Sequence, residues 1–344
     1  MKTIKMIVWG LALVMVIGRT GWAQSEKPEK PKLVLAVGGG QGLIYLPFAL
    51  TARLGYFKEA GLDADIENLA GGAQALRALI GGSADAVSGF YDHTIQMQAQ
   101  GKSIKAFAMQ QRYPGLVLIV SRNARDKGVK TLADLKGKKI GVTALGSSSH
   151  FFVNFLLTGA GVSTDEFSTI GVGLGSTAIA AFRSNQIDAL SALEPSVTTL
   201  QASGDIGLIL ADTRTTKGTF EVFGGPYPSA CLYAREEFIR QYPHTVQALT
   251  TAMVRTLTWI KTHKAEEITA LMPEDYYQGN RELYTQAVRN MTDSYSQDGM
   301  ISAPDTKNVM KVLSFDPAVK RAAINLSETY DMRFVEAYWK SHKK

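Results

Sequence analysis

Glycine and serine gather in one short segment, Gly146 to Ser149, whose residue types fit a specific kind of chemistry. Backbone N–H groups and hydroxyls at the start of a helix can hold an anion, and the helix dipole adds to the attraction. A similar arrangement, Gly173 to Thr177, follows one predicted strand later. Serine and threonine are also common N-caps, which would explain either segment alone without any ligand. Three serines together favour a neutral cradle for a carboxylate, a sulfonate or a similar group.

Further candidate residues follow the predicted strands, at the carboxyl ends of those strands. Ligands of open α/β sheets bind at this edge, where helix N-termini point. Gly38 to Gly42 follows the first strand, Gly71 and Gly72 follow the second, Tyr91 to His93 follow the third, and Glu194 follows a later one. The glycines at 38–42 do not meet the G-x-G-x-x-G spacing, so the sequence argues against a dinucleotide site.

We predict one ligand-binding set built from these segments. The tyrosines in it could form a pocket wall, or they could pack between domains. Asp92 and Glu194 could hold an amine or a hydroxyl of the ligand, or they could only cap the helices that follow them. The predicted ligand-binding residues are Gln41, Gly42, Tyr45, Gly71, Gly72, Gln74, Tyr91, Asp92, Ser147, Ser148, Ser149, His150, Gly175, Ser176, Thr177, Glu194 and Tyr227.

The sequence predicts no catalytic residue, no metal ligand and no cofactor. Asp92, His93 and a serine have the residue types of a catalytic triad, but an adjacent Asp and His seldom pair through their side chains. The five histidines lie far apart, without H-x-x-H or H-E-x-x-H spacing, and neither G-x-S-x-G nor the P-loop motif occurs. The single cysteine, Cys231, stands in an apolar run that suits a buried structural thiol, and one cysteine cannot form an internal disulfide.

The first 23 residues have the pattern of an export signal. Lys2 and Lys5 precede an apolar run from Met6 to Ile17, and Gly21 and Ala23 are small residues that suit cleavage after Ala23. The run is too short for a membrane-spanning helix, which needs about 20 residues. The net charge is +6, and the basic residues are scattered along the chain without a run of like charges. This weak positive balance suits a small anion and argues against nucleic acid as a partner.

Short β-type runs alternate with helical patterns over most of the chain. This alternation predicts an α/β fold with two similar Rossmann-like units, each with a mostly parallel sheet, followed by a helical C-terminal tail. One helix is expected from Leu46 to Phe57, and a short helix capped by Thr131 is expected up to Leu135. The expected strands lie at 33–37, 64–69, 85–89, 105–109, 139–143, 168–172, 189–193, 207–211 and 229–234.

Two crossings between the units are expected, near Leu116 to Arg122 and near Tyr227 to Arg235. The second crossing would return the chain to the first unit, so the tail would not be a third domain. We therefore expect lobe 1 to comprise residues 33–118 and 232–344, and lobe 2 to comprise residues 119–231.

Several stretches of this sequence together match one family of binding proteins. Gly55-Tyr-Phe-Lys-Glu-Ala-Gly-Leu-Asp63, Gly71-Gly-Ala-Gln-Ala-Leu76 and Gly82-Ser-Ala-Asp85 lie in the first unit. Leu132 to Val142 with the following Gly146-Ser-Ser-Ser, and Phe182 to Ala189 with Glu194-Pro195, lie in the second. Across roughly residues 33–270, the chain resembles the sulfonate/nitrate/taurine-type solute-binding proteins of ABC importers. This group also contains the pyrimidine-precursor binding proteins related to thiamine synthesis.

The resemblance implies a two-lobed periplasmic binding protein fold of type II, with two crossover segments between the lobes. It further implies a periplasmic protein that closes on its ligand and presents it to an inner-membrane permease. We expect a monomeric, non-enzymatic protein whose ligand is a small organic anion, a sulfonate or a carboxylate. By the same match, pocket-lining positions fall at Gln41, Gly72, Tyr91, Ser148, Ser149, Ser176 and Glu194.

Three alternatives stay open beside a binder of organic anions. They are a binder of a thiamine-precursor-like heterocycle, an exported enzyme on the same scaffold, and a sensor domain. The yeast-type pyrimidine synthase of this fold carries a cysteine-rich motif, whereas this chain has only Cys231. Ser191-Ala-Leu-Glu194 stands where alkanesulfonate binders often have a tryptophan-rich segment, which puts simple alkanesulfonates in doubt.

Overall fold

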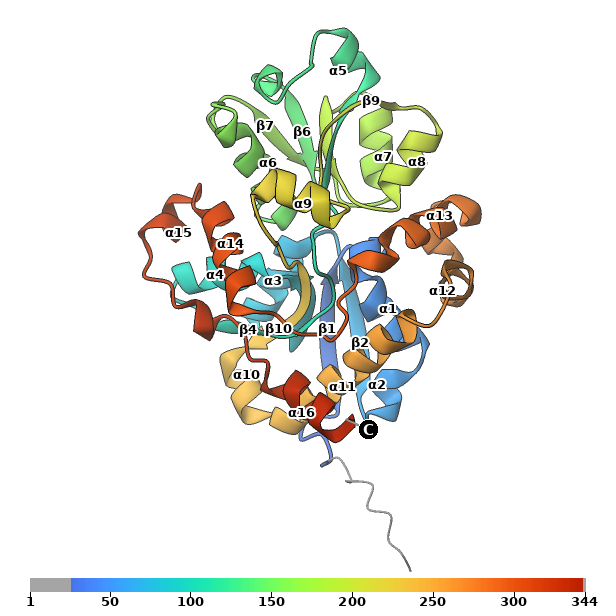
Figure 1. The fold of residues 1–344 in the computed structure, drawn as a ribbon, viewed down its shortest axis with the longest axis vertical. Helices are drawn as coiled ribbons and strands as arrows, with labels where there is room; N and C mark the ends of the chain where they lie inside the picture. Colours follow the sequence, from blue (N-terminus) through green and yellow to red (C-terminus); the bar gives the residue numbers. More distant parts are fainter. Residues whose placement is uncertain (1–25, 343–344) are drawn as a thin grey trace, which may run out of the picture.

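The computed structural model describes residues 26–342, and it contains two five-stranded sheets, one in each half of an elongated molecule (Figure 1). The predicted export signal, Met1 to Ala23, lies outside the described residues. The first sheet consists of β1 (Lys32–Gly38), β2 (Asp63–Leu69), β3 (Ala86–Phe90), β4 (Ile104–Met109) and β10 (Ala230–Arg235). The second sheet consists of β5 (Val117–Ser121), β6 (Lys139–Val142), β7 (Ser168–Gly171), β8 (Ala189–Ala192) and β9 (Ile206–Asp212).

The two sheets share one strand order, β2-β1-β3-β10-β4 in the first and β7-β6-β8-β5-β9 in the second. In the first sheet, β1 pairs in parallel with β2 and β3, and β10 is antiparallel to β3 and β4. In the second sheet, β6 pairs in parallel with β7 and β8, and β5 is antiparallel to β8 and β9. Four strands of each sheet therefore run in one direction. This confirms the predicted pair of similar α/β units with mostly parallel sheets, and the structure adds that each sheet has one reversed strand.

Helices lie on both sides of each sheet (Figure 1). In the first half of the chain the α-helices are α1 (Leu46–Arg53), α2 (Tyr56–Glu59), α3 (Gly72–Gly81), α4 (Asp92–Ala99), α5 (Arg122–Asp126) and α6 (Ser148–Gly159). Next come α7 (Ser176–Arg183), α8 (Ser196–Ala202), α9 (Thr216–Phe223), α10 (Glu236–Gln241) and α11 (Pro243–Ile260). The last are α12 (Ala265–Leu271), α13 (Arg281–Met291), α14 (Ala303–Leu313), α15 (Pro317–Arg321) and α16 (Arg333–His342). Short 3-10 helices are η1 (Leu43–Tyr45), η2 (Ala133–Leu135), η3 (Glu274–Tyr277), η4 (Thr292–Ser294) and η5 (Leu326–Glu328).

The chain passes between the two sheets at 110–116 and returns at 213–229, and the two stretches are hydrogen-bonded to each other. The N–H of Thr213 donates to the carbonyl of Leu116 at 2.9 Å, and the N–H of Ser229 donates to the carbonyl of Gln111 at 3.1 Å. The crossings expected from the sequence, at 116–122 and 227–235, are displaced from these stretches. Most of the residues expected to cross instead form the strands β5 and β10. The strand expected at 229–234 is confirmed as β10, although the same residues were also assigned to a crossing. For β5 no strand was predicted: its side chains are all buried, and a fully buried strand shows no polar alternation that would mark it in the sequence.

Two helix predictions differ from the structure in a way that local chemistry explains. Gly55 adopts φ +76° and divides the helix expected from Leu46 to Phe57 into α1 and α2, since a left-handed residue cannot continue a helix. The helix expected to be capped by Thr131 is only the 3-10 turn η2. There the Asp134 carboxylate accepts from the Thr131 N–H at 2.8 Å and from its hydroxyl at 2.9 Å, so Thr131 donates rather than caps.

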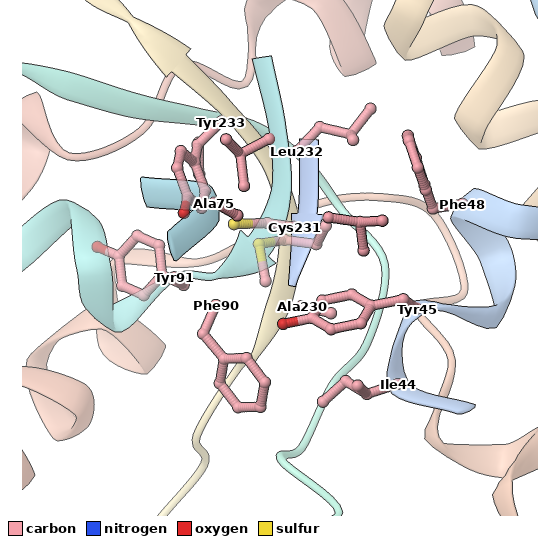
Figure 2. Packing of buried hydrophobic residues seen from close by; sticks show 14 of the residues in the cluster. Ile44, Tyr45, Phe48, Ala75, Phe90, Tyr91, Ala230, Cys231, Leu232 and Tyr233 are labelled. Atoms are coloured by element: carbon pink, nitrogen blue, oxygen red, sulfur yellow. The ribbon is translucent and has the colours of Figure 1, made fainter. Parts of the chain in front are cut away.

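The interior of the first lobe is built around β1, β3 and β10, where aromatic rings pack beside Cys231 (Figure 2). Tyr45 and Phe90 meet edge to face with ring centroids 6.4 Å apart. Cys231 is fully buried, and burial raises the pKa of its thiol well above the ordinary value. This confirms the expected buried thiol, which is held protonated and inert.

Most of the helical tail packs on the first lobe. The helix α11 contacts α1, α2 and α16, and α10 contacts β10. One tail helix, α13, also contacts α8 of the second lobe. Within residues 26–342, none of the helices combines the length and the apolar character that crossing a bilayer requires.

Candidate ligand-binding site

The two lobes face each other across a small cavity. Lobe 1 contributes backbone and side chains at the ends of β1 and β3 and at the start of α3, and lobe 2 contributes the loops after β6 and β8. The cavity holds about 10 Å³, which is room for about one water molecule. A ligand of several heavy atoms therefore requires the lobes to move apart. The lining residues are Gly38, Tyr45, Gly72, Phe90, Leu116, Thr143, Ser147, Ser148, Ser149, Leu174 and Leu193.

Two helix starts, those of α3 and α6, meet at this cavity from opposite lobes. The N–H of Ala73, in the first turn of α3, donates to the Ser147 hydroxyl at 2.9 Å across the lobe boundary. The backbone approaches its neighbours closely here: a Cβ on Gly71 would lie 3.1 Å from the Ala144 Cβ, and one on Gly72 would lie 3.2 Å from Cε1 of His93, so either side chain would be tightly packed. Because the first amides of a helix have no partner within it, both helices direct N–H groups and positive dipole ends to one place.

The three serines of the predicted cradle all lie at the cavity, but their hydroxyls already have protein partners. Ser147 accepts the bond from Ala73, and Ser148 donates to Oδ1 of Asp92 at 2.7 Å, so these two hydroxyls join the lobes. Ser149 accepts from the N–H of Thr143 at 2.9 Å within lobe 2. The groups left to hold an anion are therefore the amides at the start of α6 rather than the hydroxyls.

Asp92 is a completely buried carboxylate beside the cavity. Besides the bond from Ser148, its Oδ2 accepts a 3.1 Å bond from the Tyr227 hydroxyl. Burial raises the pKa of Asp92, while His93, Ser148 and Tyr227 act in the opposite direction. Tyr227 stacks on Phe223 with ring centroids 4.4 Å apart. The predicted residues Asp92, Ser148 and Tyr227 thus form one hydrogen-bonded group that links lobe 1, lobe 2 and the returning crossing segment.

The neighbouring His93 does not form a catalytic relay with Asp92. Its Nδ1 lies 3.1 Å from the Tyr233 hydroxyl, away from the two partners of Asp92. Burial lowers the pKa of His93, so the ring is neutral near pH 7. Within the described part of the chain, its buried Nε2 has no hydrogen-bond partner. The ring lies against the start of α3, since a Cβ on Gly72 would be 3.2 Å from its Cε1.

Glu194 is buried, and both of its carboxylate oxygens are in use. One accepts from the N–H of Thr198 in the first turn of α8 at 2.9 Å, and the other pairs with Nη1 of Arg214 at 2.7 Å. Its carbonyl accepts from the N–H of Leu43 in lobe 1 at 2.9 Å. Of the two explanations that the sequence allowed, these contacts support the capping role.

Arg214 was not among the residues predicted from the sequence. It also pairs with Asp212, through Nη2 at 2.6 Å, and its side chain is 17% exposed. A buried Glu at a strand end needs a basic partner, and that requirement is the signal that could have directed attention to the arginine after β9.

The remaining predicted residues divide into two groups. Tyr45 lines the cavity, Gly42 begins η1, and Gln41 approaches the start of α7 at Gly175. Oε1 of Gln74 is buried beside Gly71 and has no partner among residues 26–342. The structure does not bring the others to the cavity: Tyr91 bonds Thr329, His150 accepts from the N–H of Gly146, and Ser176 and Thr177 are exposed on α7. The sequence missed the apolar wall, which consists of Phe90, Leu116, Leu174 and Leu193.

The fold and the cavity between its lobes define a class, the two-lobed periplasmic binding proteins. The chain belongs to the NMT1/THI5-like family, whose model matches residues 45–267. A solved structure of a protein from Bordetella bronchiseptica RB50 is 42% identical, with a TM-score of 0.89, over 92% of this chain and 99% of that one.

Two further solved structures share the fold at lower identity. The alkanesulfonate-binding protein SsuA from Xanthomonas axonopodis pv. citri, bound to MOPS, has 18% identity and a TM-score of 0.68 over 88% of this chain and 98% of that one. The periplasmic nitrate-binding protein NrtA from Synechocystis PCC 6803 has 16% identity and a TM-score of 0.70 over 92% of this chain and 90% of that one. The predicted family resemblance is therefore confirmed.

Curated relatives from Brucella abortus, provisionally named as binding proteins, are 31% identical over 204 residues. The match spans 58% of this chain and 58% of the length of those relatives.

Proposed function

We propose that this protein is the periplasmic substrate-binding component of an ABC importer, which holds a small organic anion between its lobes and delivers it to a membrane permease. The observation that carries the proposal is the meeting of α3 and α6 at one buried cavity. Two helix N-termini supply neutral donors, which bind an anion without requiring a basic side chain. The lining residues include neither Lys nor Arg.

The apolar wall of the cavity narrows the class of anion. Tyr45, Phe90, Leu174 and Leu193 line the same cavity as the polar helix starts. A ligand with an acidic head group and a carbon-containing body matches both surfaces, whereas a bare inorganic anion uses only the polar one. A sulfonate or a carboxylate fits this division. The relative bound to MOPS, itself a sulfonate, supports this class, while the nitrate-binding relative shows that the fold also serves a smaller anion.

Binding requires that the lobes open. The proposed moving units are residues 33–118 with 232–344 and residues 119–231, joined by the two paired crossing segments. Hinge closure around a ligand is a common motion of two-lobed binding proteins. Ligand should therefore reduce the radius of gyration in small-angle scattering, and an unchanged profile at saturation would mean that the lobes are fixed.

The direct test is calorimetry on the purified chain with MOPS, a small carboxylate and nitrate as probes, after native mass spectrometry for ligand carried through purification. Ser148→Glu places a carboxylate at the start of α6 and should abolish binding of the anion. The matched control is Ser163→Glu, which adds the same charge at an exposed position of lobe 2. Binding that survives in a folded Ser148→Glu variant would remove this helix start from the site.

A second candidate function, binding of a thiamine-precursor-like heterocycle, rests on a different observation. Asp92 and Oε1 of Gln74 are buried acceptors near the cavity, and acceptors suit ring N–H or amino groups of a neutral or cationic ligand. An aminopyrimidine that binds while MOPS and carboxylates do not would favour this alternative. Recovery of the probe unchanged after incubation distinguishes either binder from an enzyme on the same scaffold.

A further inference from the structure

A second contact between the lobes lies beside the cavity, and the C-terminal part of the chain makes it. The segment from η3 to α13 rests on the first lobe, where α13 contacts η1 and α12. The same helix α13 also contacts α8 in the second lobe, just above it in Figure 1. At this boundary, Nε2 of Gln278 lies 3.4 Å from the hydroxyl oxygen of Ser196, the first residue of α8.

Gln278 has an unfavourable backbone conformation for its residue type. It follows η3 with φ +50° and ψ +35°, in the left-handed region. Glycine and asparagine are the usual residues at such a position, because a larger side chain meets steric resistance there. The next residue, Gly279, also has a positive φ of +83°. The stability of this turn alone would therefore favour a residue other than glutamine.

The side chain of Gln278 is directed toward the second lobe and is only partly satisfied there. Its Oε1 is buried and has no hydrogen-bond partner among the residues that the structure describes. A Cβ on Gly175, just before α7, would lie 3.4 Å from Nε2 of Gln278 and 3.1 Å from Oε1 of Gln41. Two glutamine side chains from the first-lobe side thus reach the starts of α7 and α8 together. A strained backbone and an unpaired buried oxygen both lower stability.

We propose that Gln278 is a positioning residue that clasps the second lobe and sets the balance between the open and closed arrangements. It is not among the residues that line the cavity, so it acts through the position of α8 rather than by touching the ligand. The inference rests on the proposed function in one respect, because it requires lobes that open. It assigns the C-terminal segment a role in closure in addition to its packing on lobe 1.

The test measures the distance between the lobes by pulsed electron spin resonance on ligand-free protein. Spin labels go on cysteines introduced at two exposed residues, Arg77 on α3 and Asp165 in lobe 2; the native Cys231 is buried. Gln278→Gly removes the side chain and relieves the backbone. Gln278→Asn keeps an amide that tolerates the left-handed conformation but is one methylene too short to reach Ser196. Ser196→Ala removes the partner.

Each of these three variants should raise the ratio of open to closed protein about threefold to tenfold, the range expected for one lost hydrogen bond. Gln278→Gly should do so without a lower melting temperature, a combination that a merely structural role of this residue would not produce. The control is Gln286→Asn, the same change at an exposed position of α13, which should leave the distances as in the unmodified protein.

Unchanged distances in Gln278→Gly and Ser196→Ala would overturn the proposal, and so would an equal opening in the Gln286→Asn control. A single fixed distance in all proteins would overturn it as well, because the lobes would not open. The measurement uses no ligand, so failure of the clasp is distinguishable from failure of anion binding. The latter appears only in calorimetry with MOPS, a carboxylate or nitrate.

Discussion

The two faces of the cavity have the same backbone plan and different side chains. Each lobe presents the carboxyl ends of parallel strands and the start of a helix, α3 on one face and α6 on the other. Lobe 1 adds glycines and two buried titratable groups, Asp92 and His93. Lobe 2 adds hydroxyls and an acid, Glu194, that is already paired with a cation.

The difference shows how one fold can serve several ligands. The shared backbone supplies amide donors and dipoles from both sides, which any small anion can use. The side chains determine which ligand is preferred. The buried Asp92 disfavours a second negative charge nearby, whereas the Glu194 carboxylate pairs with Arg214 and caps α8. Selectivity should therefore respond mainly to changes on the face of lobe 1, and stability of the lobe boundary to changes on the face of lobe 2.

The largest expected effect concerns the paired acid of lobe 2. Glu194→Gln removes the buried charge that faces Arg214, and breaking such a pair costs about 3 kcal/mol of unfolding free energy. Affinity for MOPS should change little, because Glu194 has no free oxygen to offer a ligand. Urea denaturation and calorimetry on this variant measure the two quantities. Asp205→Asn, which breaks an exposed pair with Arg183, is the control and should cost less than about 1 kcal/mol. Weaker ligand binding at unchanged stability would instead support a direct role for Glu194.

The next largest effect is a difference in unfolding free energy between alanine substitutions at one glycine in each sheet. A Cβ on Gly38, at the end of β1, would lie 2.3 Å from the carbonyl carbon of Gly71, and backbone there cannot move without shifting α3. A Cβ on Gly141, in β6, would lie 2.4 Å from the flexible end of Ile187. Gly38→Ala should therefore cost about 2 kcal/mol or more of unfolding free energy and Gly141→Ala clearly less. Equal costs in urea denaturation would show that β1 and α3 are not held against each other as described.

A pH-dependent effect on stability is expected only from the lobe 1 face of the cavity, which carries Asp92. Burial raises the pKa of Asp92 in the folded protein above its ordinary value of 3.8. The folded state therefore binds more protons than the unfolded state between these two pKa values, and stability falls as the pH rises through this window. Asp92→Asn removes the titration, so its stability relative to the unmodified protein should increase as the pH rises above about 4. Thermal denaturation over pH 4 to 8 measures this, and parallel curves for the two proteins would contradict the raised pKa.

The smallest expected effect distinguishes Ser147 from Ser149, two serines on the face of lobe 2. Ser149→Ala leaves the N–H of Thr143 without its partner inside lobe 2, and should lower unfolding free energy by about 1 kcal/mol without changing the lobe arrangement. Ser147→Ala breaks the bond from Ala73 across the boundary, and should increase the radius of gyration of the ligand-free protein. Scattering and calorimetric melting on both variants test the difference, and an identical response would mean that neither hydroxyl is specific to the lobe boundary.

Local patterns in the sequence predicted the architecture well. Glycines after strands, apolar runs of strand length and helical spacing are properties of neighbouring residues, and they led to the two similar units and the buried Cys231. Where the prediction differed, as at Gly55 and in the strand β5, the decisive information was a single left-handed residue or burial on both faces of a strand.

The hydrogen-bond partners of the polar side chains could not be predicted from the sequence, because these contacts join residues far apart in the chain. The sequence by itself determined the class of fold, which follows from short-range periodicity and turn chemistry. Only the tertiary structure decided that Tyr91 bonds Thr329 away from the cavity, that Glu194 is taken up by Arg214, and that Ser148 reaches Asp92. The physical reason is that a polar side chain must be satisfied wherever it is buried, and the nearest available partner is set by packing rather than by sequence distance.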